Sequence, residues 1–200
     1  MTFLKPSSAQ ATGGSGTDTL SGFEGLMGSL FGDTLRGNSV NNGLAYTSNQ
    51  LVGLEGADTI IGGAGAESII GDAGGNFPGV PFNEFLTGTW TGKDTLTGGG
   101  GADRFMFANV FDSTVGTGRD VITDFVRGAD KVDLSAMDAQ TAAGTANDTF
   151  AFIAGTSFTA AGQVRFANGI LYGNTDADTS AEFEIALTGI TTLAASDFVL

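Results

Sequence analysis

Polar and hydrophobic positions recur along this chain with a period of nine residues. Acidic or amide residues stand at multiples of nine from one another, and an apolar residue usually follows two positions later; these polar positions are Asp58, Glu67, Asn76, Asp94, Asp103 and Asp112. The apolar residues are flanked by Thr or Ile in several copies, and β-branched side chains favour extended backbone. The period therefore predicts a solenoid in which very short strands stack from coil to coil.

Glycine-rich segments precede most of the phased acids. The clearest nine-residue units are Gly13 to Ser21, Gly62 to Ile70 and Gly98 to Met106, and looser copies are Gly28 to Arg36, Gly37 to Ala45, Gly53 to Ile61 and Thr89 to Thr97. The first six residues of a unit predict a tight turn, because glycine reaches positive φ without a Cβ clash. We expect two units to complete one coil, so that an acid lies next to the turn eighteen residues later.

The period is interrupted at three places. It slips between Asp18 and Asp33 and again between Asn42 and Asp58, which predicts insertions in the first half of the repeat. The segment from Gly71 to Gly88 contains two prolines and places a phenylalanine where an acid is due, so we expect a loop there.

The acids at the turns indicate a metal. A turn that presents carbonyl oxygens and one carboxylate offers several hard ligands, and a second turn stacked on it can complete the shell that Ca²⁺ prefers. Mg²⁺ demands a stricter octahedron, and a transition metal is disfavoured because the chain has no His and no Cys. Several bound Ca²⁺ ions are therefore expected.

The candidate calcium ligands are turn glycines, which offer backbone carbonyls, and the acids or amide of the units. They are Gly13, Gly14, Gly16, Asp18, Asp33, Gly56, Asp58, Gly63, Gly65, Glu67, Asn76, Gly92, Asp94, Gly99, Gly101, Asp103, Asp120 and Asp124. Asp58, Asp94 and Asp103 are the strongest candidates. Any single Asp could instead only stabilise its own turn by hydrogen bonds. Asp120 and Asp124 lie about one coil beyond Asp103, where they either close the last site or face solvent from a strand.

Composition agrees with a β-rich fold. The 200 residues are 41% hydrophobic and include 33 Gly and 3 Pro, which favours strands and turns over helices. The net charge of -14 makes nucleic acid and anionic membrane poor partners. The same acid excess suits a fold that needs a cation. The absence of Cys excludes disulfides and suits passage of the unfolded chain through a channel.

The pattern G-G-x-G-x-D-x-U-x resembles the RTX repeat, the calcium-binding β-roll of proteins exported by bacterial type I secretion systems. The stretch Asp103 to Asp138, with ADRFMF, RDVITDF and ADKVDLSAMDA, resembles the C-terminal domain of serralysin-type metalloproteases. The ending Asp197-Phe198-Val199-Leu200 is similar to the terminus of those secretion substrates. The resemblance implies an all-β fold, a parallel β-roll (right-handed β-solenoid) followed by a β-rich C-terminal cap.

We expect a polar lead-in over residues 1–12, a calcium-binding β-roll over 13–106, and a C-terminal cap and secretion domain over 107–200. Alternation predicts strands in the cap at Asp120 to Phe125, Lys131 to Leu134, Thr149 to Ile153, Gln163 to Phe166, Ile170 to Tyr172 and Glu182 to Leu187. Met1 to Thr12 lacks the apolar core of a secretory signal, and no long apolar run follows. With the resemblance, this indicates a secreted bacterial protein without an N-terminal signal peptide, exported by type I secretion machinery that reads its C-terminus.

Enzyme chemistry is disfavoured by the composition. Without His, neither the zinc site of a serralysin nor a Ser-His-Asp triad can form, and Cys catalysis is likewise excluded. The expected function is therefore a non-catalytic calcium-binding module that folds after export. The alternative is an extracellular adhesive, surface-layer or polysaccharide-binding structural protein with a cell-surface or polysaccharide partner. An acidic run from Asn174 to Glu182 lacks the glycine and final acid of an EF-hand, which favours a solvated loop.

Overall fold

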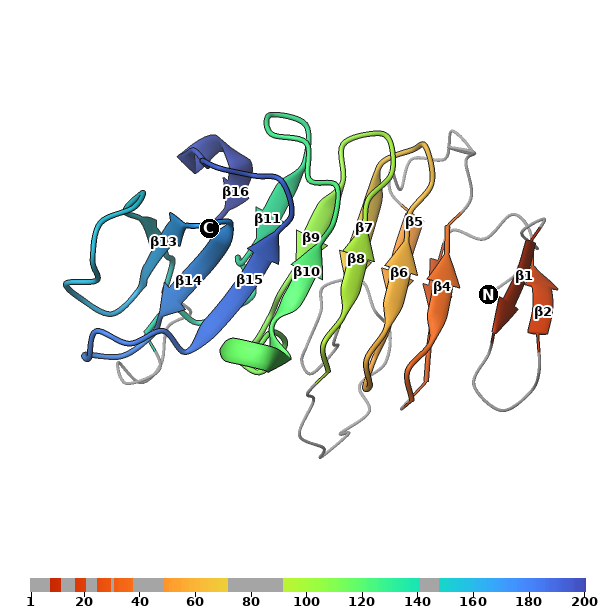
Figure 1. Ribbon diagram of the computed structural model, residues 1–200, viewed down its shortest axis with the longest axis horizontal. Coiled ribbons are helices and arrows are strands. Elements are labelled where there is room, and N and C mark those ends of the chain that lie inside the picture. Colours follow the sequence, from red (N-terminus) through yellow and green to blue (C-terminus); the bar gives the residue numbers. More distant parts are fainter. Residues whose placement is uncertain are drawn as a thin grey trace.

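The computed structural model describes residues 8–11, 17–20, 25–29, 31–37, 49–71, 92–140 and 148–200. Nearly all regular structure within them is β-strand, arranged in two sheets (Figure 1). The larger sheet has the order β12-β13-β14-β15-β10-β8-β6-β4-β1-β2, and the smaller has the order β16-β11-β9-β7-β5-β3. The predicted all-β fold is confirmed. No helix in these ranges has the length and apolar character needed to cross a membrane.

The strands are short, and from β3 to β11 they alternate between the two sheets along the chain. The larger sheet contains β1 (Ser8–Ala11), β2 (Thr17–Leu20), β4 (Thr34–Arg36), β6 (Thr59–Ile61), β8 (Thr95–Thr97), β10 (Asp120–Ile122), β12 (Ala151–Phe152), β13 (Gln163–Ala167), β14 (Ile170–Asn174) and β15 (Phe183–Leu187). The smaller sheet contains β3 (Gly25–Met27), β5 (Asn49–Val52), β7 (Glu67–Ile70), β9 (Arg104–Met106), β11 (Lys131–Asp133) and β16 (Phe198–Val199). Two 3₁₀ turns are η1 (Gly116–Gly118) and η2 (Ala195–Asp197).

Alternation between the sheets winds the chain into a flattened coil whose strands pair in parallel with those of the next coil (Figure 1). This is the predicted parallel β-roll. The parallel stacking continues beyond Met106 into β10 and β11. It extends to β15, which pairs in parallel with β10, and to β16, which pairs in parallel with β11, so the C-terminal strands close the end of the roll.

The coils differ in length, which corrects the expected spacing of eighteen residues. That spacing holds for β5 and β7, where Asn49 pairs with Glu67. The chain advances 25 residues from Asp33 to Asp58, 36 from Asp58 to Asp94, and 26 from Asp94 to Asp120. Strand registry is fixed by apolar residues that must face the core, whereas the turns can absorb insertions. The predicted loop from Gly71 to Gly88 falls largely on residues outside the described ranges.

The unit from Gly13 to Ser21 also differs from the expected coil. β2 pairs antiparallel with β1, and β1 pairs antiparallel with β4 through Ala11 and Thr34. Asp18 thus lies within a strand opposite Gln10 rather than at a turn of the parallel stack. A hairpin occupies the sheet edge that a further coil would otherwise cover.

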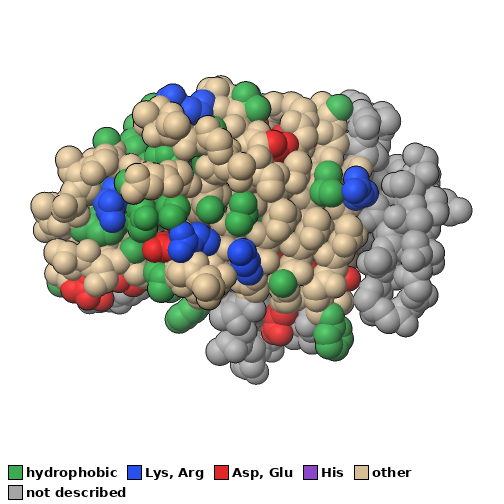
Figure 2. Space-filling model, viewed as in Figure 1, with side chains coloured by type: hydrophobic (Ala, Val, Ile, Leu, Met, Phe, Trp, Pro, Cys, Tyr) green, Lys and Arg blue, Asp and Glu red, His purple; other side chains and the backbone are tan. Residues whose placement is uncertain are grey.

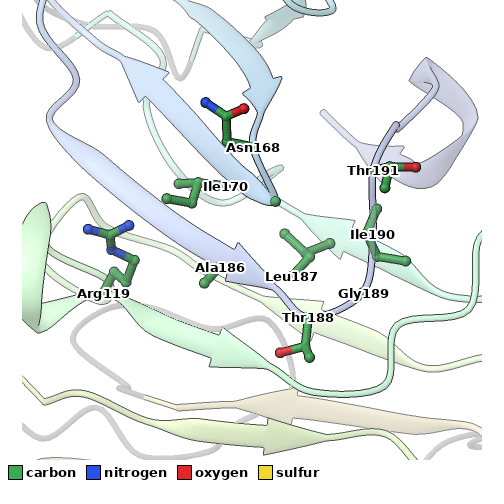
Figure 3. Close-up of a pocket in the computed structure, with 10 residues that line it drawn as sticks. Arg119, Asn168, Ile170, Ala186, Leu187, Thr188, Gly189, Ile190 and Thr191 are labelled. Carbon is green, nitrogen blue, oxygen red and sulfur yellow. The ribbon is translucent and has the colours of Figure 1, made fainter.

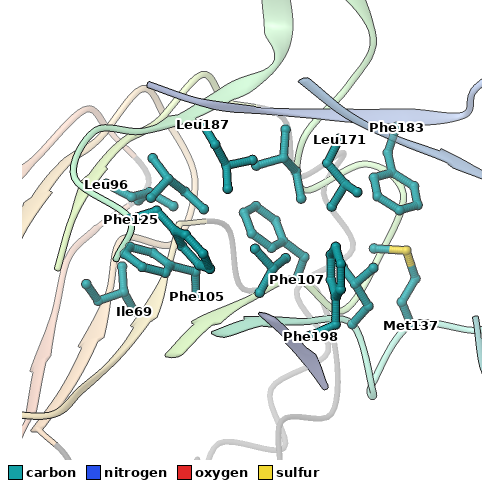
Figure 4. Close-up of a cluster of buried hydrophobic side chains, with 14 of the residues drawn as sticks. Ile69, Leu96, Phe105, Phe107, Phe125, Met137, Leu171, Phe183, Leu187 and Phe198 are labelled. Atoms are coloured by element: carbon teal, nitrogen blue, oxygen red, sulfur yellow. The ribbon is translucent and has the colours of Figure 1, made fainter. Parts of the chain in front are cut away.

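The core fills the space between the two sheets. The apolar residues two positions after the acids are fully or almost fully buried; they are Leu35, Ile60, Ile69, Leu96 and Phe105. They form one cluster with buried residues of the C-terminal region, including Phe107, Phe125, Leu171, Phe183, Leu187 and Phe198 (Figure 4). The rings of Phe150 and Phe183 meet edge to face with centroids 5.8 Å apart. Roll and cap therefore share this main cluster, and Val52 and Ile70 form a second, smaller one.

Candidate metal centre

The turns between the sheets gather along two edges of the roll, and each edge carries a row of acids. At the first edge the chain passes from the smaller sheet to the larger, and the acids beside β4, β6, β8 and β10 are Asp33, Asp58, Asp94 and Asp120. At the second edge it passes back, and the acids beside β7, β9 and β11 are Glu67, Asp103 and Asp130. All seven side chains are at most 5% exposed. Accordingly, Figure 2 shows only scattered acidic side chains on the viewed face, despite the net charge.

Hydrogen bonds connect the acids of the first edge from coil to coil. The backbone N–H of Asp33 donates to Oδ1 of Asp58 over 2.7 Å, and the N–H of Asp58 donates to Oδ1 of Asp94 over the same distance. The N–H of Asp94 donates in turn to Oδ1 of Asp120, again over 2.7 Å. One oxygen of each accepting carboxylate therefore binds the backbone of the preceding coil. These bonds join two coils, so they differ from the hydrogen bonds by which an Asp could only stabilise its own turn.

The second edge repeats this arrangement. The backbone N–H of Glu67 donates to Oδ1 of Asp103 over 2.9 Å, and the N–H of Asp103 donates to Oδ1 of Asp130 over 3.0 Å. Asp130 was not among the predicted site residues, although it lies 27 residues after Asp103 and so keeps the nine-residue phase. It was missed because no glycine-rich turn precedes it.

The second carboxylate oxygen has no donor in two of these acids. Oδ2 of Asp58 and Oδ2 of Asp103 are buried and accept no hydrogen bond from the described residues. The ion pairs among the described residues involve other acids: Arg104 pairs with Asp133, Arg119 with Glu184 and Arg127 with Asp197. A buried charged oxygen without a partner is costly. Such an oxygen fits a site for a cation.

Glycines make room for these carboxylates. A Cβ atom on Gly53 would lie 2.1 Å from Oδ2 of Asp58, and one on Gly98 would lie 2.4 Å from Oδ2 of Asp103. The glycine that meets Asp94 in this way is Gly71, also at 2.1 Å. The sequence unit that begins at Thr89 has no glycine at its first position, and Gly71, directly after β7, occupies the corresponding place beside Asp94. Any larger residue would push the acid out of its place.

Backbone carbonyls of neighbouring coils lie close to the glycines of the same turns. A Cβ atom on Gly92 would lie 1.9 Å from the Gly56 oxygen, and one on Gly101, at φ 128°, would lie 2.0 Å from the Gly65 oxygen. The same holds for Gly99 above the Gly63 oxygen. The edges thus combine carboxylate and carbonyl oxygens, the hard ligand set that Ca²⁺ takes.

Four predicted ligands, Gly13, Gly14, Gly16 and Asn76, lie outside the described residues, as does the side chain of Asp18. Asp120 is buried in the first edge and does not face solvent. Asp124 accepts hydrogen bonds from the N–H groups of Gly98 at 2.9 Å and Gly99 at 2.8 Å, one with each oxygen. Asp124 therefore holds the turn of the preceding coil.

The buried carboxylates have altered protonation. Burial raises the pKa of Asp58 to about 6, against the opposing effect of the hydrogen bond from Asp33. Burial likewise raises the pKa of Asp103, and the negative charges of Asp130 and Asp124 add to the rise. Without a cation, burial disfavours the ionised form of these carboxyl groups, which is the form that an exposed carboxyl adopts at neutral pH.

This predicts a pH dependence of the metal-free chain. A carboxyl whose pKa is higher in the folded state than in the unfolded state loses folding free energy as pH rises, by about 1–2 kcal/mol for Asp58 between pH 5 and 8. In EDTA, strand content measured by far-UV circular dichroism should therefore fall as pH rises from 5 to 8. Constant or rising strand content over that range would show that ionisation of these buried acids does not destabilise the metal-free fold.

The acidic run after β14 forms a separate cluster. Carboxylate oxygens of Asp176, Asp178 and Glu182 lie within 4.8 Å of one another. They accept hydrogen bonds from nearby backbone N–H groups, including Thr175 to Glu182 at 2.6 Å and Ser180 to Asp178 at 2.5 Å. These bonds organise the loop itself, and they leave the three carboxylates close enough together to hold one cation.

An open hollow of about 570 Å³ lies on β14 and β15, where Ile170 and Ala186 contribute to its lining (Figure 3). Arg119 at its border is already engaged, since Nε donates to the Gly116 carbonyl at 2.7 Å and Nη2 pairs with Glu184 at 3.0 Å. The hollow contains none of the acids of the two edges. The oxygen-rich edges are the stronger candidate site.

Comparison with known proteins identifies the family. The model for the C-terminal region of M10 serralysin peptidases matches residues 9–200. Among solved structures, the AlgE6R2 subunit of the Azotobacter vinelandii mannuronan C5-epimerase is 28% identical, with a TM-score of 0.52, over 86% of this chain and 90% of that chain. The AlgE6R3 subunit of the same epimerase is 26% identical, with a TM-score of 0.34, over 88% and 76%. No curated protein matches the chain. The chain therefore belongs to the serralysin C-terminal family, whose RTX β-rolls are of the calcium-binding type.

Proposed function

We propose that this protein is a non-catalytic calcium-binding module that folds when Ca²⁺ binds its two rows of acids after export through a type I secretion system. One observation carries the proposal. Asp58 and Asp103 each use one carboxylate oxygen to hold the preceding coil, while the other oxygen is buried without a hydrogen-bond donor. A cation is the partner that this geometry lacks.

The ligand chemistry favours calcium over other metals. The edges offer carboxylate and backbone carbonyl oxygens from turns of unequal length, and Ca²⁺ accepts six to eight such ligands in irregular geometry. Mg²⁺ needs a near-ideal octahedron, and the chain has neither His nor Cys to select a softer metal. Calcium is also the ion typical of the family.

Folding and binding are coupled in this proposal. Stacking the coils brings buried carboxylates of like charge together, and burial already raises the pKa of Asp58 and Asp103. Extracellular calcium modules have dissociation constants of about 0.1 to 1 mM, so ~10 mM Ca²⁺ would add roughly 1.4 to 2.7 kcal/mol per site. Several sites together would decide whether the chain folds.

Export before folding is supported by the position of the C-terminus. Phe198, within the terminal segment expected to direct secretion, is 7% exposed, and β16 pairs with β11. Secretion machinery that reads this segment must therefore meet the chain before the roll is complete. No catalytic role is needed to explain the buried acids, because the coil-to-coil hydrogen bonds and ion binding account for them.

Calorimetric titration and native mass spectrometry test the proposal. The protein should bind several Ca²⁺ ions and bind Mg²⁺ far more weakly, and Asp58→Asn should lose at least one ion. Asp148→Asn also removes one negative charge, but at a residue outside both rows, and this variant should bind as many Ca²⁺ ions as the unaltered protein. Failure of the unaltered protein to bind Ca²⁺, or equal binding of Mg²⁺, would contradict the proposal.

A further inference from the structure

The hollow on the outer face of β14 and β15 has an apolar floor. Ile170 and Ala186 pair across the two strands. Both side chains point away from the core, since their neighbours Leu171 and Ile185 are buried in it. Ile190 flanks the floor and packs partly against the core. The volume of about 570 Å³ lies within the range of roughly 300–1,000 Å³ that is typical of ligand sites.

Hydrogen-bonding side chains surround this floor (Figure 3). Asn168 lies in the turn between β13 and β14, whereas Thr188 and Thr191 follow β15. All three are exposed, and their side chains form no hydrogen bond with other residues in the described part of the chain. The hollow therefore presents hydroxyl and amide groups at its border and aliphatic groups at its centre.

Backbone contacts hold the border in place. Asn168 and Gly169 form the two-residue turn of the β13–β14 hairpin, with φ of 56° and 79°. The N–H of Leu187 donates to the Gly169 carbonyl at 2.8 Å, which joins this turn to β15. The N–H of Thr188 donates to the Ile122 carbonyl at 2.9 Å. A ligand would meet a border whose backbone is already ordered, which reduces the entropic cost of binding.

The charges around the hollow disfavour a charged ligand. Among the residues that line it, only Arg119 is charged, and Glu184 pairs with this side chain at 3.0 Å. No acid lines the hollow to bind a cationic ligand, and the net charge of -14 repels an anionic polymer. An entirely apolar ligand would cover the exposed hydroxyl and amide groups without bonding to them, which costs free energy. The ligand that fits is uncharged, apolar on one face and polar at its edge.

We propose that this hollow binds an uncharged polysaccharide through a short stretch of sugar units. A pyranose ring presents a face of C–H groups, which fits the floor of Ile170 and Ala186. Its edge carries hydroxyl groups, which can bond to Asn168, Thr188 and Thr191. Because the hollow is open, a polymer can continue beyond it. The inference goes beyond calcium binding, since none of the residues that line the hollow belongs to the two rows of acids.

A nuclear magnetic resonance titration of the isotope-labelled protein in Ca²⁺ tests the inference. The probes are uncharged oligosaccharides of glucose, mannose and xylose, each compared with an oligogalacturonate of the same length. At least one uncharged probe should shift the amide signals of Gly169, Ala186 and Gly189 in a saturable manner, and the oligogalacturonate should not. If none of the uncharged probes shifts these signals, or if the oligogalacturonate binds as tightly, the inference is wrong.

Three variants locate the binding. Ala186→Glu places a charge on the floor and should weaken binding at least about tenfold, because the sugar would cover an unpaired carboxylate. Asn168→Gly removes the border amide but keeps a residue that accepts positive φ, and should weaken binding severalfold. Ala151→Glu adds the same charge at an exposed position of β12 outside the hollow, and should bind like the unaltered protein.

Far-UV circular dichroism in Ca²⁺ should give the same strand content for all three variants, so that a loss of binding reports on the hollow and not on folding. Equal sugar affinity of Ala186→Glu and Ala151→Glu would place the sugar elsewhere and overturn the inference. Shifts of the hollow signals when the unaltered protein is diluted without sugar would also overturn it, because they would assign the hollow to contact between copies of the chain.

Discussion

Chelation of calcium at neutral pH is expected to abolish most of the strand signal of this protein in far-UV circular dichroism. Several sites at roughly 1.4 to 2.7 kcal/mol each add up to a large part of the 5–15 kcal/mol by which a domain is typically stable. Without the ion, Asp58 and Asp103 keep a buried oxygen that no donor satisfies. The coils that they join should then separate.

The measurement is a Ca²⁺ titration of the EDTA-treated protein followed by a second addition of EDTA. Strand content should return with Ca²⁺ in a cooperative transition and disappear again on chelation. Mg²⁺ at the same ionic strength serves as the control and should restore little. If the spectrum in EDTA equals that in Ca²⁺, folding does not depend on the ion and the roll is only a scaffold.

Removal of the last four residues is expected to impair calcium-driven folding strongly. Phe198 is buried and packs against Phe152 with ring centroids 4.9 Å apart, and the N–H of Leu134 donates to the Val199 carbonyl at 2.9 Å. Asp197 accepts a hydrogen bond from the N–H of Gly128 at 3.1 Å and pairs with Arg127. Loss of a buried phenylalanine side chain alone typically costs about 3–5 kcal/mol.

The terminus would then contribute to folding in addition to the export role that the family resemblance implies. The Ca²⁺ concentration at the folding midpoint should rise severalfold in the truncated protein, or folding should be lost. Phe198→Ala, which keeps the backbone bonds of β16, should show most of the effect, whereas deletion of Leu200, which is only partly buried against the core, should show a smaller one. An unchanged midpoint after the four-residue deletion would show that the terminal strand is dispensable.

The kind of fold was predictable from the sequence, but the order in which coils stack was only partly so. The nine-residue period identifies which side chains face the core, and Leu35, Ile60 and Leu96 are buried as it requires. The period does not determine how many residues each turn absorbs. For that reason the advance of 36 residues between Asp58 and Asp94 could not be distinguished from two regular coils.

The candidate site shows the same division. Asp58, Glu67, Asp94 and Asp103 were identified by their phase, since these acids and the strand positions repeat together, whereas Asp33 and Asp120 are out of phase with them. Their bonds to the preceding coil depend on registry and could not be derived, and Gly71 meets Asp94 only because the chain returns there after a long excursion. Asp130 kept the phase but lacked a glycine-rich turn, so the motif gave no reason to select it.

The coil-to-coil hydrogen bonds give the roll a direction. In both rows the earlier coil donates an N–H and the later coil supplies the accepting carboxylate. Removal of a coil from the N-terminal side would leave an accepting carboxylate that water or a cation can satisfy. Removal of a coil from the C-terminal side would leave a backbone N–H without an acceptor at the edge of the core. Proteins built in this way can gain or lose repeats at their beginning more easily than at their end, so evolutionary variation in length should accumulate toward the N-terminus.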